Sequence, residues 1–144
     1  MRRAAWKRQA PVLGAIAAGG ALGAEVRYLV SLANADRPAF PWTTAVENVS
    51  GCLLIGVLMA VLLELTSPHR LLRPFLGVGV LGGYTTFSAY AVDVRVLLAD
   101  ERALAALTYL VATPLLALVA VIVAMRFTRS VLTCRRWRTG GARR

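Results

Sequence analysis

Four long runs without a charged residue dominate this chain and constrain its fold. They extend over residues 9–24, 48–63, 74–92 and 103–125. A helix needs roughly 20 residues to cross a hydrocarbon core about 30 Å thick, and each run reaches that length once its flanks are included. The sequence therefore predicts an all-α membrane protein with four transmembrane helices, at about 11–32, 43–66, 74–98 and 102–127.

The composition agrees with membrane insertion. Hydrophobic residues make up 58% of the 144 residues, and the mean hydropathy is +0.62, which is too apolar for a soluble domain of this length. The basic start, MRRAAWKRQA, precedes an apolar run as in a signal peptide, but the run is long and no convincing cleavage site follows it. We therefore treat this run as the first span. Cys52 and Cys134 show neither a disulfide framework nor a metal-binding spacing.

Basic residues concentrate on one face of the predicted membrane domain. With four spans, the two ends of the chain and the second connection share one side. That side holds 13 of the 17 Lys and Arg residues: Arg2, Arg3, Lys7, Arg8, Arg70, Arg73, Arg126, Arg129, Arg135, Arg136, Arg138, Arg143 and Arg144. The positive-inside rule predicts that residues 1–10 and the tail 128–144 are cytoplasmic, on either side of a transmembrane domain at 11–127. Despite the net charge of +10, we expect the tail to bind anionic lipid rather than nucleic acid.

The third predicted span contains the stretch GGYTTFS, residues 82–88. Consecutive glycines lower helix propensity, and the hydroxyl groups offer the backbone alternative local hydrogen bonds. We therefore expect the helix to break near its centre. Irregular backbone at membrane depth is tolerated where it is buried in protein or lines a cavity, and its freed carbonyl groups can coordinate a cation. The stretch predicts a carbonyl-built ion site, or an ion pathway, at Gly82 to Thr86.

Three of the predicted helices carry pairs of polar or aromatic residues at helical spacing: Thr44 and Asn48, Phe87 and Tyr90, and Tyr109 and Thr113. A single Thr or Asn in a span usually serves as an interhelical hydrogen-bonding residue. The recurrence on three helices instead indicates a file of neutral donors and aromatic edges. Glu25 and Arg27 also fall inside a predicted span, where ionisable residues are costly and often mark a pathway.

Three segments resemble the signature blocks of the Fluc, or CrcB, family of fluoride channels. They are GGALGAEVRY (19–28), TTAVENVSGCLLIG (43–56) and GVGVLGGYTTFSAY (77–90), of which the third is the most specific. The resemblance spans about residues 11–125. It implies a dual-topology dimer of two antiparallel subunits, with two fluoride pores along the interface and a sodium ion at its centre. That sodium is structural and is not transported.

The resemblance also implies roles for individual residues. The backbone carbonyls of Gly82 and Thr85 match the sodium ligands, and the second pore phenylalanine of the family falls on Tyr90. This departure keeps an aromatic ring with an electropositive edge, but its hydroxyl alters the spacing or adds a donor. The other pore positions fall on Asn48, Thr44, Phe87, Tyr109 and Thr113, and supporting positions fall on Arg27, Thr86, Ser88 and Asp93.

The implied activity is passive fluoride export that reduces fluoride toxicity. Fluoride is strongly hydrated, so a channel must replace its water with donors that bind it without trapping it, and neutral amide and hydroxyl groups meet this need. A negative-inside potential drives anions outward. Glu47 lies beside the pore asparagine, and its charge would repel fluoride. We therefore expect it to point away from the conduction path or to be paired.

The strong bias of basic charge raises a further hypothesis about assembly. A chain that inserts in both orientations needs nearly balanced basic residues on its two faces, whereas here the opposite face has only Arg37 and Arg102. We therefore expect one orientation, and a heterodimer with an oppositely oriented paralogue. One degraded pore at Tyr90 would fit such a pair.

Two other functions compete with the channel. A small multidrug-resistance exporter would use Glu25 in the first helix as its proton and cation site, although that family does not need GGYTTFS. A structural membrane subunit would conduct no ion. An enzyme is not expected, because the single histidine, His69, lies in a connection without a nucleophile or metal ligand nearby.

Overall fold

The structure is a computed structural model that describes the backbone of residues 2–33, 40–64 and 68–140, and the side chains of 9–32, 40–64 and 68–134. Every regular element in these ranges is helical. The elements are α1 (Arg2–Ala33), α2 (Trp42–Glu64), η1 (Arg73–Leu81), α3 (Gly82–Tyr84), α4 (Phe87–Ala99) and α5 (Ala103–Gly140).

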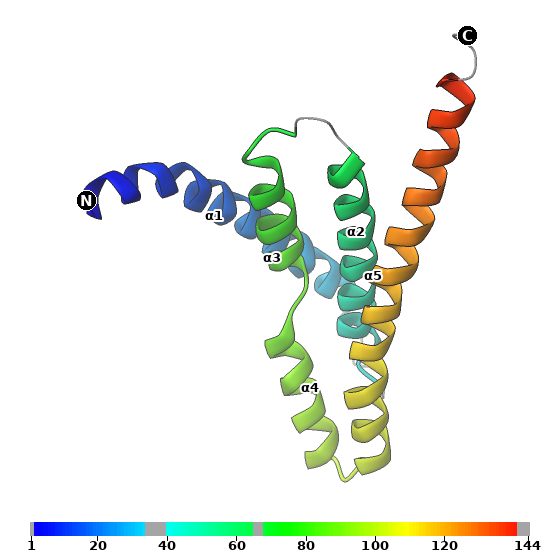
Figure 1. Cartoon of the computed structure of the whole chain (residues 1–144). Coiled ribbons are helices and arrows are strands. Elements are labelled where there is room, and N and C mark those ends of the chain that lie inside the picture. Colours follow the sequence, from blue (N-terminus) through cyan, green and yellow to red (C-terminus); the bar gives the residue numbers. More distant parts are fainter. Residues whose placement is uncertain (1, 34–39, 65–67, 141–144) are drawn as a thin grey trace.

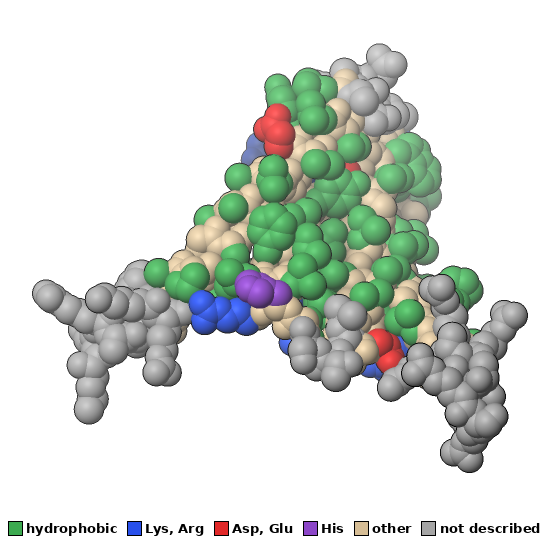
Figure 2. Space-filling model, turned by 90° about the horizontal axis from the view of Figure 1, so that it is seen from above, with side chains coloured by type: hydrophobic (Ala, Val, Ile, Leu, Met, Phe, Trp, Pro, Cys, Tyr) green, Lys and Arg blue, Asp and Glu red, His purple; other side chains and the backbone are tan. Residues whose placement is uncertain are grey.

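Four helical stretches of the described chain are long and apolar enough to cross a membrane. They run Gln9–Leu32, Trp42–Glu64, Arg73–Ala99 and Ala103–Cys134. In the space-filling view, apolar side chains cover most of the visible described surface, and charged side chains lie toward its edges (Figure 2). Helices that are apolar on all sides suit a lipid environment. The prediction of an all-α protein with four spans is confirmed.

The helices form two packed groups. α2 and α5 lie side by side over much of their length, and α1 packs on η1 and α3 (Figure 1). The third span contributes to both groups, because η1 and α3 contact α1 whereas α4 contacts α5. This change of neighbour takes place between Tyr84 and Phe87.

The backbone leaves the helical conformation at the point where the neighbour changes. Thr85 has φ −79° and ψ 151°, and Thr86 has φ −144° and ψ 124°, so both residues are extended. The short helix α3 precedes these residues, and the element before it, η1, is a π-helix of 9 residues. Such i→i+5 bonding is rare and is frequently found at functional sites.

Glycines allow the first half of the third span to approach α1 closely. A Cβ atom built on Gly19 would lie 3.0 Å from the Cα atom of Gly79 and would collide with the carbonyl oxygen of Phe75. In lipid, where no hydrophobic force drives helices together, such close approach supplies the dispersion contacts that hold them. The glycines therefore explain how α1 and η1 pack.

The first and last helices extend beyond the expected spans, into the basic segments at 1–10 and 128–144. α1 begins at Arg2, and α5 continues to Gly140. The basic residues of these ends therefore lie largely on turns that continue the membrane helices.

Candidate functional site

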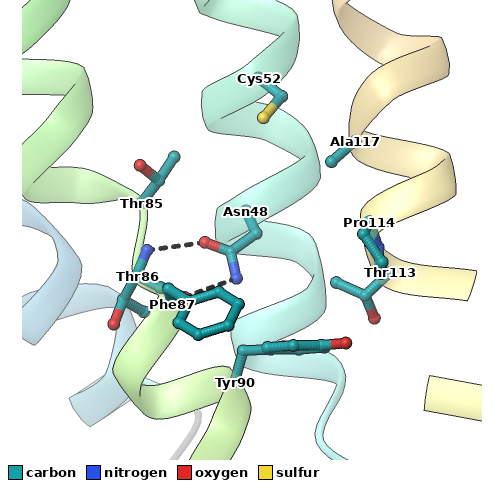
Figure 3. Close-up of a pocket in the computed structure, with 9 residues that line it drawn as sticks. All are labelled: Asn48, Cys52, Thr85, Thr86, Phe87, Tyr90, Thr113, Pro114 and Ala117. Atoms are coloured by element: carbon teal, nitrogen blue, oxygen red, sulfur yellow. Dashed lines mark hydrogen bonds between the residues drawn. The ribbon is translucent and has the colours of Figure 1, made fainter. Parts of the chain in front are cut away.

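A cavity of about 310 Å³ lies beside the extended residues of the third span (Figure 3). Its lining comes from α2, from the extended pair, from α4 and from α5: Asn48, Cys52, Thr85, Thr86, Phe87, Tyr90, Thr113, Pro114 and Ala117. We call it the break cavity. A mostly apolar pocket with a few convergent polar groups is the usual form of a binding site.

The Asn48 side chain is bonded to the extended backbone through both ends of its amide. Its Oδ1 accepts a hydrogen bond from the Thr86 backbone N–H at 2.7 Å, and its Nδ2 donates to the Thr86 carbonyl oxygen at 2.9 Å (Figure 3). A side-chain amide has two N–H groups, so one is left for another acceptor. Asn48 therefore fixes the position of the extended segment and still offers a donor.

Thr86 caps the helix that follows the extended pair. Its hydroxyl oxygen accepts a hydrogen bond from the Ala89 backbone N–H at 3.2 Å and lies 3.2 Å from the Ser88 hydroxyl. A side-chain acceptor at this position satisfies one of the donors left free at a helix start. The N-terminal end of α4, with its partial positive charge, consequently borders the break cavity at Phe87.

These bonds also leave two carbonyl groups without their ordinary helical donors. In a continuous helix, the N–H of Thr86 would bond to the carbonyl of Gly82, and the N–H of Ala89 to the carbonyl of Thr85. Asn48 takes the first donor and Thr86 the second. No cluster of three or more His, Cys, Asp or Glu suited to a metal ion occurs among the described residues. The carbonyl groups of Gly82 and Thr85 therefore lack their helical donors, and unwound backbone carbonyl groups of this kind can coordinate a cation.

Two tyrosines extend from the break cavity into the protein. Tyr90 forms part of its wall, and its hydroxyl donates to the Leu110 carbonyl oxygen at 2.6 Å. Tyr109 is 0% exposed, and its hydroxyl donates to Asp93 Oδ2 at 3.1 Å. The Tyr109 hydroxyl is therefore directed to Asp93, and Tyr109 is not part of the cavity wall.

Aromatic rings form a row from the cavity inward. The ring centroids of Phe87 and Tyr90 are 5.6 Å apart, and those of Tyr90 and Tyr109 are 5.2 Å apart. Phe40 meets Tyr109 edge to face at 5.4 Å. Phe87 begins this row and is 80% exposed.

Thr44 lines a second cavity, of about 380 Å³, and is not part of the break cavity. This second cavity lies between α1, α2 and α4, and its lining includes Thr44, Arg27 and Glu47. Glu47 is only 3% exposed, and its Oε1 and the Arg27 Nε have no hydrogen-bond partner in the described part of the chain. Glu47 is therefore outside the break cavity, in a different cavity that it shares with an arginine.

The break cavity brings together four of the six expected pore residues: Asn48, Phe87, Tyr90 and Thr113. Its wall also includes Thr85 and Thr86, which were expected at the sodium site and in a supporting position, and three residues that were not expected at the site. Cys52 follows Asn48 by four residues, and Ala117 follows Thr113 by four, so helical spacing could have indicated both. The third addition, Pro114, lies beside Thr113 in α5.

Comparison with known proteins gives consistent matches along the chain. The family described as CrcB-like protein, Camphor Resistance (CrcB), matches residues 14–125. The chain is 52% identical over 137 residues to the fluoride-specific ion channel FluC 1 of Streptomyces coelicolor, covering 94% of this chain and 87% of the relative. It is 48% identical over 134 residues to FluC 2 of Nocardia farcinica, also named a fluoride-specific ion channel, covering 92% of this chain and 91% of the relative.

Proposed function

The chain belongs to the CrcB family of ion channels, and from this premise we propose that it is a passive, fluoride-selective channel of the cell membrane. The family assignment excludes both an enzyme and the small multidrug exporter. The observation that carries the proposal is the meeting of Asn48, Phe87, Tyr90 and Thr113 in the break cavity, because these residues come from three helices.

The chemistry of the break cavity suits a small anion that must also leave. Asn48 retains one N–H, Thr113 contributes a hydroxyl, and Phe87 has an electropositive ring edge. The described residues that line the cavity include no Lys or Arg. Conduction requires binding that is favourable for entry and weak enough for exit, which neutral donors provide.

A structural sodium ion is part of this proposal. The carbonyl groups of Gly82 and Thr85 would hold it, because their usual helical donors are bonded to Asn48 and Thr86 instead. Unwound backbone carbonyl groups at membrane depth are known to coordinate sodium. Two carbonyl groups from each of two subunits would supply four oxygen ligands. Such an ion would hold the two extended segments together without itself being conducted.

We further propose that the working channel is an antiparallel dimer, assembled with an oppositely oriented paralogue. Phe87 is 80% exposed although it lines the break cavity, so a partner subunit would complete the wall there. The 13 basic residues on one face favour a single orientation with both termini cytoplasmic. The membrane potential then drives fluoride out of the cell, at about 2.3 kcal/mol per charge per 100 mV.

Fluoride-electrode efflux from proteoliposomes tests the proposed function. The chain is reconstituted alone and with its candidate partner, after purification with sodium or with potassium as the only alkali cation. We expect fluoride efflux that requires sodium, together with negligible chloride efflux. Glu25→Gln is the matched control, because Glu25 is exposed on α1 and should leave efflux unchanged.

The outcomes separate the parts of the proposal. No fluoride efflux under any condition contradicts the channel function. Efflux that is equal in sodium and in potassium contradicts only the structural sodium. Full efflux from the chain alone contradicts only the heterodimer.

A further inference from the structure

A proline interrupts the hydrogen bonding of α5 beside the break cavity. Pro114 has no backbone N–H, so the carbonyl of Leu110, four residues earlier, loses the donor that an α-helix normally supplies. The proline ring also crowds this carbonyl and turns it away from the helix axis. An unsatisfied carbonyl inside a membrane costs several kcal/mol, so another donor must reach it.

The Tyr90 hydroxyl is that donor. It bonds to the Leu110 carbonyl oxygen at 2.6 Å, and the tyrosine is only 7% exposed. In the close-up, the Tyr90 ring reaches across the cavity from α4, with its hydroxyl at the end nearest Thr113 and Pro114 (Figure 3). The hydroxyl is thus bonded to α5, at the end of the ring that points away from Asn48.

We propose that Tyr90 is a positioning residue of the pore whose hydroxyl replaces the backbone donor that Pro114 removes, thereby joining α4 to α5. The bond fixes one end of the ring, and the rings of Phe87 and Tyr109 pack beside it, with centroids 5.6 and 5.2 Å away. Tyrosine at this position therefore holds the cavity wall in place. It neither adds a donor for the anion nor marks a disabled pore.

Under this proposal, the need for the Tyr90 hydroxyl depends on which residue stands at 114. A phenylalanine that only lined the pore would show no such dependence. With proline at 114, the hydroxyl is required. With alanine at 114, a backbone N–H returns to Leu110 and the hydroxyl becomes dispensable. The link to conduction rests on the proposed function, whereas the bond between the helices does not.

A double-mutant cycle of Tyr90→Phe and Pro114→Ala tests this dependence. Thermal unfolding in detergent and fluoride efflux are measured for the dimeric channel carrying each single change and both. Tyr90→Phe alone should raise the unfolding constant by about tenfold, equivalent to about 1.4 kcal/mol. It should also lower fluoride efflux by about 2- to 10-fold, because the loss of one net hydrogen bond shifts the equilibrium between positions of the cavity wall by about this factor. In the Pro114→Ala background, the same change should alter neither by more than about twofold.

Tyr84→Phe is the matched control. It also removes one tyrosine hydroxyl from an interhelical contact, because Tyr84 Oη lies 3.1 Å from the Ser50 hydroxyl, but it leaves Leu110 untouched. Its effect on unfolding should be the same with proline or alanine at 114.

Additive effects of Tyr90→Phe and Pro114→Ala on unfolding would overturn the proposal, as would higher efflux from Tyr90→Phe alone. If Tyr90→Phe fails to fold, recovery of folding in the double variant supports the proposal, and equal failure contradicts it. If the wild-type protein conducts no fluoride, the proposed function fails. The unfolding cycle still shows whether the Tyr90 hydroxyl replaces the donor that Pro114 removes.

Discussion

At the scale of single residues, Asn48 shows how one side chain serves both the backbone and the cavity. Its two bonds join residues that are 38 positions apart in the sequence, so helical spacing could predict its face but not its partner. The same limit applies to Tyr90, whose acceptor is a backbone carbonyl 20 positions away. Resemblance to a family gives a residue a role, whereas only the fold shows which groups already occupy its polar atoms.

Replacing Asn48 by Asp tests both of its roles. A carboxylate cannot donate to the Thr86 carbonyl, and its charge would repel an anion. We expect fluoride efflux to nearly stop and the protein to lose about 1–3 kcal/mol of stability, as for an unsatisfied buried polar group. Efflux and thermal unfolding, followed by tryptophan fluorescence, provide the measurements.

Ser50→Ala is the comparison for Asn48→Asp, because Ser50 lies two residues along α2 and contacts Tyr84 rather than Thr86. It should destabilise the protein less than Asn48→Asp. An Asn48→Asp protein that unfolds at the wild-type temperature would show that the two bonds do not hold the extended segment. Unchanged efflux would remove Asn48 from the pore.

At the scale of helices, the third span differs most from what its sequence specifies. The apolar run at 74–92 predicts a span, but nothing in its composition distinguishes the π-helix of η1 from an α-helix. The two forms differ in hydrogen-bond register, i→i+5 in a π-helix and i→i+4 in an α-helix. Glycine at positions 19 and 79 indicates close helix packing, yet which glycines face each other depends on the crossing of the two helices.

Adjacent glycines on α1 should respond oppositely to alanine. A Cβ atom at Gly19 would collide with η1, whereas a Cβ atom at Gly20 would meet no described heavy atom within 4 Å. Gly19→Ala should therefore destabilise the protein by about 1–3 kcal/mol through overpacking. Gly20→Ala should stabilise it by up to about 1 kcal/mol through higher helix propensity.

Thermal unfolding in detergent, with the wild type as reference, measures both glycine variants. Equal shifts for Gly19→Ala and Gly20→Ala would contradict the packing of α1 on η1. A destabilised Gly20→Ala would instead indicate a neighbour outside the single chain.

At the scale of the whole molecule, the basic residues on one face bear on the orientation of the chain in the membrane, and the exposed Phe87 bears on what surrounds the chain. Hydropathy and the placement of basic residues predict four spans because membrane insertion depends on these quantities directly. They do not predict what lies beside the exposed Phe87, since they describe how a helix crosses the membrane and not which groups surround it. The four spans could thus be predicted from residues 9–125, and the surroundings of Phe87 could not.

Labelling of Cys134 tests the proposed single orientation. Cys134 is exposed near the end of α5, and Cys52→Ala leaves it as the only thiol. We expect a membrane-impermeant maleimide added from outside to label Cys134 in inverted vesicles, whose outer surface is the cytoplasmic face. It should not label Cys134 in right-side-out vesicles. Labelling of about half of the protein from each side would contradict the single orientation, and with it the reason for an oppositely oriented paralogue.

The change of neighbour along the third span also couples the two proposed ion sites. One half of the span is attached to α1 and the other to α5, and the residues proposed for the cation and for the anion both lie at the junction. Under the proposed function, a substitution that shifts either helix group would displace both sets of residues at once. Variants with altered anion binding would then also have altered sodium binding, so the two properties would change together.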